Sequence, residues 1–498
     1  MAGLKSLAKD TAIYGLSSII GRFLNWCLVP MYVRVLTNVN EYGIVTNLYG
    51  WTAFVMVLLT FGMETGFFRF ANKPELDSKK VYSSSFWFVA ILSAVFLAGI
   101  TLFIHPIASA MDYQGKEDFI MMMAVIVALD AFSAIPFAYL RYEKRPIRFV
   151  CLRLFSIFSN IILNLFVFLA CPVIYKSNPE LISWFYNPDY SVGYIFAVNL
   201  VCSVLVTLLM FPEYVKAFIM PDWKLMKQMV KYCFPLLILG IAGILSQTID
   251  KMLFPFLFPD PDEALYQLGI YGANFKIAVV MVMFIQAFRF AYEPFVFAHN
   301  KGEDKRPAYA QAMFYFVVCT FLIFLGVTGY MDLLKFIVSK EYYEGLKVVP
   351  VVMLAEMCFG IFFNLSFWYK LCDQTKWGAY FSMMGCAIIV LINVLFVPHY
   401  GYMASAVATL AGYATIMVVS YLVGQRVYPI NYDMKSIGFY TLVFAGLYAC
   451  QKLFYFDNLI LRLAFNTVIL ITFIAVFIQR EIGYTKLKTM ILKQGKKL

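Results

Sequence analysis

The chain has 498 residues, of which 62% are hydrophobic and only 14% are charged, and its mean hydropathy is +0.76. A soluble domain carries about 25% charged residues, so this composition excludes a soluble globular protein, a disordered chain and a small disulfide-linked scaffold. The net charge is +11. The basic residues do not form a patch interleaved with aromatic residues, so we expect no nucleic-acid partner.

Fourteen apolar stretches are long enough to cross a bilayer. A hydrocarbon core of about 30 Å needs roughly 20 apolar residues in a helix. The stretches are 11–36, 43–72, 81–104, 119–140, 149–175, 192–212, 233–258, 269–298, 308–329, 347–369, 378–398, 403–424, 436–453 and 459–479. The sequence therefore predicts an all-α polytopic membrane protein with about fourteen transmembrane helices.

The basic residues between these stretches predict the orientation. With a cytoplasmic N-terminus, 26 of the 40 Lys and Arg fall in cytoplasmic segments and 8 on the other side, the rest lying within spans. Lys and Arg concentrate in cytoplasmic loops of membrane proteins. We therefore expect both termini on the cytoplasmic side, and the positive net charge reflects topology.

No motif in the chain predicts catalysis or metal binding. The ten Cys lie in or beside apolar runs without a C-x-x-C pair, and the three His are isolated near helix ends. The connecting loops are short, and the chain has no G-x-x-x-x-G-K-[ST], G-x-S-x-G or H-E-x-x-H motif. We expect no enzyme activity, no metal and no cofactor, so the function must lie between the helices.

The two parts of the chain resemble each other. Tyr42-Gly43-Ile44 opens the second stretch and Leu268-Gly269-Ile270 opens the eighth, 226 residues later. Between the parts, 222–231 places Lys on one helical face and apolar residues on the other, with Asp222 positioned as a cap, which predicts an interfacial amphipathic helix. We expect two parallel six-helix bundles, at 1–212 and 232–424, a cytoplasmic linker at 213–231, and two additional helices with a basic tail at 425–498.

Ionisable residues inside predicted spans are the candidate functional residues. A charge at the centre of a bilayer costs at least about 2.5–3.5 kcal/mol, so it faces a cavity or a partner. The deep charges are Arg22, Glu64, Asp130, Asp250, Lys276, Arg289 and Glu356, whereas Arg69 and Arg153 are close enough to the cytoplasmic surface to extend to it. Structural roles stay open, because Arg289 and Glu293 can neutralise each other and Asp130 and Glu356 can be protonated hydrogen-bonding groups. Of these carboxylates, Asp130, Glu356, Asp250 and Glu64 are the candidates for ion coupling.

The first two spans resemble a known family. The residues are Gly21-Arg22-Phe23-Leu24-Asn25, Leu28 to Leu36, Glu41-Tyr42-Gly43, Gly62-Met63-Glu64-Thr65 and Phe68-Arg69-Phe70. They resemble the opening of polysaccharide transporters, the oligosaccharide-lipid flippase branch of the multidrug/oligosaccharidyl-lipid/polysaccharide (MOP) exporter superfamily. The fourteen-span layout is similar over the whole chain.

The resemblance implies a V-shaped pair of bundles that moves a lipid-linked oligosaccharide to the outer leaflet of the bacterial inner membrane by alternating access. The substrate would be an undecaprenyl-pyrophosphate-linked repeat unit for O-antigen, capsule or exopolysaccharide. A cationic cavity of Arg22, Lys276 and Arg289 would suit its pyrophosphate. Transport would be coupled to a Na⁺ or H⁺ gradient or driven by substrate exchange.

Other functions remain open at this point. A lipid II flippase or a cation-coupled multidrug exporter shares the superfamily, and a membrane polymerase or glycosyltransferase is a different class. The short outward loops argue against a polymerase, and the cavity cations argue against export of cationic drugs. We expect a monomer whose partners are the lipid-linked substrate, membrane lipids and polysaccharide assembly proteins.

Overall fold

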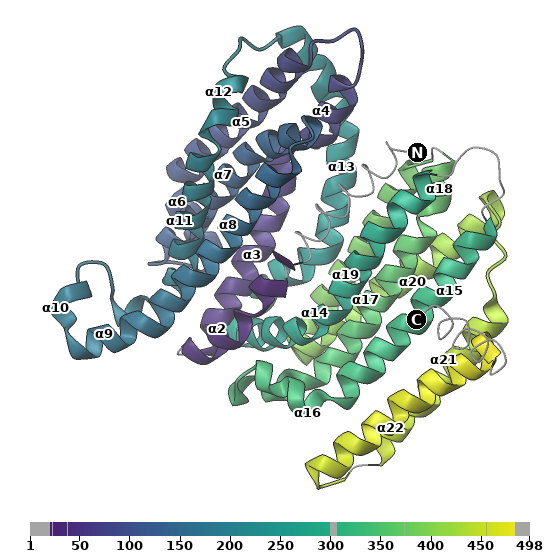
Figure 1. Cartoon of the computed structure of the whole chain (residues 1–498). Helices are drawn as coiled ribbons and strands as arrows, with labels where there is room; N and C mark the ends of the chain where they lie inside the picture. Colours follow the sequence, from purple (N-terminus) through teal and green to yellow (C-terminus); the bar gives the residue numbers. More distant parts are fainter. Residues whose placement is uncertain are drawn as a thin grey trace, which may run out of the picture.

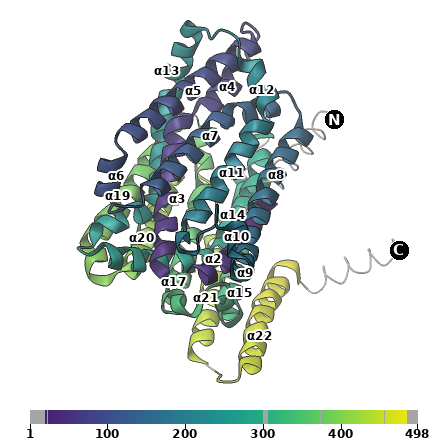
Figure 2. The same ribbon diagram turned by 90° about the vertical axis from the view of Figure 1, so that its left-hand side faces the viewer.

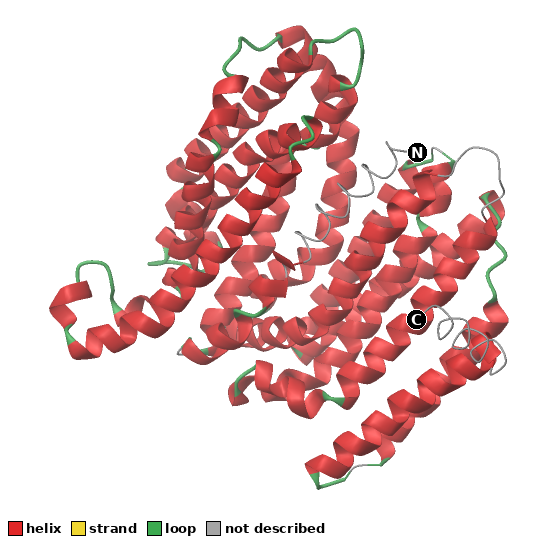
Figure 3. Ribbon diagram, in the orientation of Figure 1, coloured by secondary structure: helices red, strands yellow, loops and turns green. Residues whose placement is uncertain are grey.

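Every regular element that the structure describes is a helix (Figure 3). The computed structural model describes residues 20–21, 23–36, 38–298, 306–372, 374–454 and 456–483, with side chains except at 291, 293–298 and 482. The all-α class predicted from the sequence is therefore confirmed.

The helices form two bundles, and a C-terminal pair lies beside the second (Figures 1 and 2). The first bundle contains α2 (Val29–Val35), α3 (Val39–Thr60), α4 (Met63–Ala71), α5 (Ser78–Leu102), α6 (Ile104–Ala110), α7 (Glu117–Tyr142), α8 (Pro146–Leu165), α9 (Cys171–Ser177), α10 (Pro179–Ile182), α11 (Gly193–Leu209) and α12 (Phe211–Ala217). The second contains α14 (Pro261–Ala298), α15 (Arg306–Gly329), α16 (Met331–Leu334), α17 (Val348–Leu365), α18 (Phe367–Leu371), α19 (Lys376–Tyr400) and α20 (Tyr402–Val427). The pair is α21 (Met434–Leu453) and α22 (Leu459–Phe477), and α13 (Trp223–Leu253) contacts both α3 and α19.

The membrane spans agree with the sequence-based count. Within the described residues, eleven helices are long and apolar enough to cross a membrane, and α11 with α12 gives a twelfth although the two are bent by 57°. α21 adds a helix at the thirteenth predicted stretch. The first stretch, 11–36, is described only from Ile20 onward and without Arg22.

Backbone chemistry explains where the second predicted span bends. Phe61 and Gly62 have φ values of +53° and +68°, which end α3 and start α4. Glycine adopts this left-handed conformation without a steric penalty. α3 and α4 together still form one candidate membrane span, Val39–Ala71, so Glu64 lies in the part of that span that follows the break.

The predicted separate amphipathic helix at 222–231 is wrong. α13 begins at Trp223 and continues without a break to Leu253, so the basic segment is the start of a spanning helix. Asp222 does cap it, since its Oδ1 accepts the Lys224 N–H at 2.9 Å. The reason for the continuity is that Met229 and its apolar neighbours pack into the core of the first bundle instead of resting on lipid headgroups.

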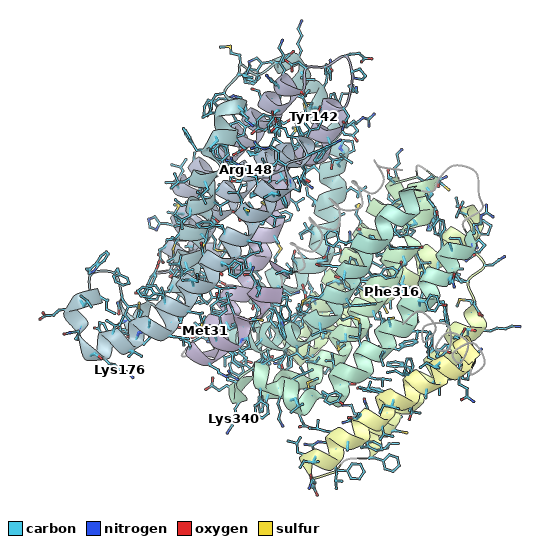
Figure 4. All side chains as sticks on the ribbon, in the orientation of Figure 1. Met31, Tyr142, Arg148, Lys176, Phe316 and Lys340 are labelled. Carbon is cyan, nitrogen blue, oxygen red and sulfur yellow. The ribbon has the colours of Figure 1, made fainter. Side chains whose placement is uncertain are left out.

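The two ends of the molecule differ in charge. The loops at 72–77, 143–145 and 218–222 lie at one end, here termed the basic end, which the distribution of Lys and Arg predicts to be cytoplasmic. Figure 4 shows Tyr142 and Arg148 toward this end, and Lys176 and Lys340 at the opposite end. The two bundles diverge toward the basic end, which gives the molecule a V shape (Figure 1).

The bundles are joined at the opposite end, where α3 packs on α14. A Cβ atom at Gly43 would lie 2.1 Å from the Leu265 carbonyl oxygen, and one at Gly269 would lie 2.2 Å from the Val39 carbonyl oxygen. Both pairs follow the offset of 226 found in the sequence, since 43 corresponds to 269 and 39 to 265. The contact is therefore self-complementary, as in a two-fold interface. Only glycine permits this backbone-to-backbone approach.

Polar contacts add to this seam. The Arg34 guanidinium donates a hydrogen bond to the Phe336 carbonyl oxygen. The Asn40 amide donates to the Asp262 carbonyl oxygen at 3.2 Å. The two bundles are thus held together at this end by side-chain hydrogen bonds as well as by close backbone packing. The V is closed here.

The C-terminal pair is attached to α15 and α16 by polar groups. Arg462 Nε lies 2.6 Å from Asp332 Oδ2, and the Asn466 amide donates to the Gly329 carbonyl oxygen at 2.7 Å. The Gln451 amide donates to the Leu325 carbonyl oxygen at 3.1 Å. Such contacts between helices inside a membrane hold them together. We therefore expect α21 and α22 to move with the second bundle.

The glycine seam generates a prediction about closure. Gly43→Ala should weaken the closed seam, because the new methyl group would overlap the Leu265 carbonyl oxygen and neither backbone can yield. A cysteine pair at Asn40 and Asp262 reports the seam, and we expect its disulfide cross-linking to fall several-fold in the variant. Gly326→Ala is the matched control, since a Cβ there meets nothing within 4 Å. Unchanged cross-linking in Gly43→Ala would contradict the assignment.

Candidate functional site

Two adjoining cavities lie between the helices. One, the interface cavity, measures about 490 Å³ and lies between α3 of the first bundle and α13, α14 and α17. The other, the first-bundle cavity, measures about 610 Å³ and lies among α3, α7, α8 and α11. Asn25, Tyr49, Asn160 and Asn199 line both cavities, so these four residues form a shared wall.

The interface cavity carries one cation without an acidic partner. Lys251, Lys276 and Glu356 are its ionisable side chains apart from tyrosines. Lys276 forms no ion pair with any residue that the structure describes. Its backbone is held by the Trp26 indole, which donates to the Lys276 carbonyl oxygen at 2.7 Å. An unpaired ammonium in a low-dielectric cavity attracts an anionic ligand.

Lys251 is neutralised by its chain neighbour. Its Nζ lies 2.9 Å from Asp250 Oδ2, and the Tyr271 hydroxyl donates to the same oxygen at 2.9 Å. Asp250 is only 3% exposed, so it faces the second bundle and not the cavity. Glu356 lines the cavity and interacts electrostatically with both Lys251 and Asp250. Three ionisable groups from α13 and α17 thus form one coupled set.

The first-bundle cavity contains two acids and two arginines. Glu64 forms a charge-assisted hydrogen bond with Arg141. Asp130 accepts a hydrogen bond from the Ser203 hydroxyl at 3.0 Å. Arg153 lies on the Phe137 ring, 4.1 Å from its centroid, and lines the cavity. The acids and the arginines of this cavity are therefore equal in number.

An amide chain crosses the shared wall. The Asn160 amide donates to Asn199 Oδ1 at 2.8 Å, and the Asn199 amide donates to the Tyr49 hydroxyl at 2.6 Å. On the other side, Asn164 donates to Asn160 Oδ1 at 3.2 Å and accepts from the Tyr32 hydroxyl at 2.9 Å. Five side chains from four helices, α2, α3, α8 and α11, are thereby fixed relative to one another.

The structure brings only some of the predicted cationic residues together. Lys276 lines the interface cavity, whereas Arg289 lies on the Phe363 ring at 4.0 Å and lines neither cavity. Arg22 and the side chain of Glu293 lie outside the described residues. Their roles stay predictions.

The predicted carboxylates divide between the two cavities. Glu64 and Asp130 line the first-bundle cavity and Glu356 the interface cavity, while Asp250 lies behind Lys251. Arg153 lines the first-bundle cavity and is an exposed residue, so its predicted extension to the surface stays open. Its guanidinium lies over the rings of Phe137 and Phe149.

Sequence reasoning missed the asparagine chain and the role of Lys251. One signal was available for the first: Asn160 and Asn164 are four residues apart in an apolar span and so share a helix face. No comparable signal marked the pairing of Lys251 with Asp250, because adjacent residues on a helix do not ordinarily face each other.

Comparison with protein families gives a match over more than half of the chain. Residues 7–294 match the family described as polysaccharide biosynthesis protein. The chain belongs to this family. Among curated proteins, no match is found.

The family member has the fold of two solved MOP transporters. The lipid II flippase MurJ in an inward closed conformation is 13% identical, with a TM-score of 0.66 over 94% of this chain and 98% of that one. An inward-facing multidrug resistance MATE family transporter is 12% identical, with a TM-score of 0.63 over 82% of this chain and 94% of that one. At such identities the likeness concerns the fold alone, and the apolar helices make the chain a multi-pass membrane protein.

The buried ion pair of this polysaccharide biosynthesis family member predicts a stability effect. Asp250→Asn should destabilise the protein by about 3 kcal/mol, because the Lys251 ammonium stays buried without its counter-charge. Asp250→Asn with Lys251→Met should recover most of this loss. Thermal unfolding in detergent provides the measurement. A single variant as stable as the parent chain would show that the pair is not a structural unit.

Proposed function

We propose that the chain is a flippase that translocates an undecaprenyl-pyrophosphate-linked oligosaccharide across the bacterial inner membrane, for O-antigen, capsule or exopolysaccharide synthesis. Family membership supports a role in polysaccharide biosynthesis, and the MOP fold supports transport. The chain moves its substrate without altering it chemically and uses no cofactor. Both termini lie in the cytoplasm, in line with the basic end.

The observation that carries this proposal is the unpaired Lys276 between the bundles. A pyrophosphate brings two or more negative charges, which are strongly disfavoured in a cavity of low dielectric unless a cation meets them. Lys276 lies where both bundles can contact a ligand. Arg22, three residues before Asn25 of the shared wall, is the proposed second cation.

The V shape supports alternating access. The bundles are closed at the opposite end and diverge at the basic end, which is the side on which a lipid-linked precursor made in the cytoplasm arrives. Closing the basic end and separating α3 from α14 would present the same site to the outer leaflet. A parallel repeat with its site between the halves is an organisation found in secondary transporters.

The energy source is proposed to be a Na⁺ or H⁺ gradient acting on Asp250 and Glu356. Their electrostatic interaction with Lys251 beside the interface cavity means that charge added to the cavity changes the cost of ionising them. Binding of the pyrophosphate and occupation of this carboxylate set would then be linked.

Lys276 gives the direct test. Lys276→Ala should reduce translocation of the lipid-linked repeat unit at least tenfold per folded molecule in reconstituted vesicles, whereas Lys276→Arg should keep most of it because the charge remains. Lys224→Ala, an exposed lysine at the basic end, is the matched control and should behave as the parent chain. Full translocation by Lys276→Ala would contradict the proposal. Translocation of lipid II or of cationic drugs in place of the repeat unit would favour another transporter of the superfamily.

Coupling is tested separately. Glu356→Gln should abolish the dependence of translocation on the ion gradient, because the neutral amide neither binds a cation nor titrates. Initial rates are compared in vesicles with a Na⁺ gradient, with a proton gradient and with neither. If the parent chain translocates equally well when both gradients are collapsed, the proposed coupling role of these carboxylates is wrong.

A further inference from the structure

The shared wall between the two cavities is built for a ligand with hydroxyl groups. Tyr32, Asn164, Asn160, Asn199 and Tyr49 form a chain in which each donor points toward the next residue, ending at the Tyr49 hydroxyl. The Tyr49 oxygen accepts from Asn199 and keeps its own proton. The Tyr49 hydroxyl donates a hydrogen bond to none of the described residues, and 40% of the residue is exposed, at the wall of the cavity.

The rest of the first-bundle cavity adds uncharged hydrogen-bonding groups. Its wall includes hydroxyl side chains as well as the three amides: Thr52, Thr60, Ser133, Ser156 and Ser203. The acids and the arginines that line it are equal in number, two of each. A volume of about 610 Å³ lies in the range of small-ligand sites, about 300–1,000 Å³. The many uncharged hydrogen-bonding groups match a ligand that carries hydroxyl groups.

The position of the first-bundle cavity relative to Lys276 determines which part of a substrate this cavity would contact. Asn25, Tyr49, Asn160 and Asn199 border both spaces, so a ligand that extends from one cavity into the other passes these side chains. A pyrophosphate held at Lys276 therefore directs the group attached to it across the shared wall. In a lipid-linked saccharide that group is a sugar.

We propose that the first-bundle cavity is a sugar subsite, in which the asparagine chain and the Tyr49 hydroxyl recognise the monosaccharide directly attached to the pyrophosphate. This inference rests on the proposed function and extends it, since it separates the site for the anion from the site that selects the glycan. A site built to hydrogen-bond a substrate hydroxyl discriminates against analogues that lack it, because its polar groups are then left unpaired.

The test uses the full chain in vesicles with four lipids. These are undecaprenyl pyrophosphate without sugar and the same lipid carrying glucose, galactose or N-acetylglucosamine. Each lipid carries a fluorescent label, and its translocation is measured with a membrane-impermeant quencher of that label. The variants are Tyr49→Phe, which removes one oxygen and keeps the ring, and Asn199→Ala, which interrupts the chain. Tyr142→Phe is the matched control, because its hydroxyl bonds the Ala71 carbonyl oxygen away from both cavities.

We expect the parent chain to prefer at least one glycosylated lipid to the sugar-free lipid. Tyr49→Phe and Asn199→Ala should each reduce translocation of the preferred lipid about fivefold, the effect of one lost hydrogen bond, and leave the sugar-free lipid unchanged. Equal losses for all four lipids would assign the chain a structural role and overturn the sugar subsite alone, as would no change for any lipid. A parent chain that moves none of the four would overturn the proposed function together with this inference.

Discussion

The close packing of α3 on α14 is the constraint on which the rest of the structure depends. Gly43 and Gly269 let two backbones meet at one end of the molecule, and from this contact the bundles diverge toward the basic end. Because the contact is self-complementary, each bundle offers the other the same surface. Residues near this axis, such as Thr46 and Gly272, face each other across it. The interface cavity begins directly beside them.

Charges inside the membrane are divided into neutralised pairs and one open cation. Glu64 with Arg141 and Asp250 with Lys251 form ion pairs, of which the second is largely buried. Lys276 has no such partner among the described residues. Under the proposed function, the paired charges hold helices together and the open charge of Lys276 binds the anionic part of the cargo. Under the further proposal, the first-bundle cavity contacts the sugar of the same cargo.

Much of the fold could be predicted from the sequence because bilayer thickness and hydrophobicity determine where spans occur. The predicted stretch 119–140 lies inside α7 (Glu117–Tyr142), and the residues that meet across the α3–α14 contact follow the offset of 226 found in the sequence. The sequence alone did not show which segments pack together. Residues 222–231 have the pattern of an interfacial helix, but Met229 is buried by helices distant in sequence. The contact of Arg153 with the Phe137 ring joins two helices and is not revealed by a local pattern.

Alternating access, in which the α3–α14 seam opens as the basic end closes, is the central proposal, and paired distance measurements test it most directly. Spin labels at Lys79 and Lys376 report the basic end, and labels at Lys116 and Lys340 report the opposite end; all four residues are exposed. Over the transport cycle with an undecaprenyl-pyrophosphate-linked saccharide, the account predicts that the first distance shortens while the second lengthens. Distances that stay constant, or that change in the same direction at both ends, would contradict it.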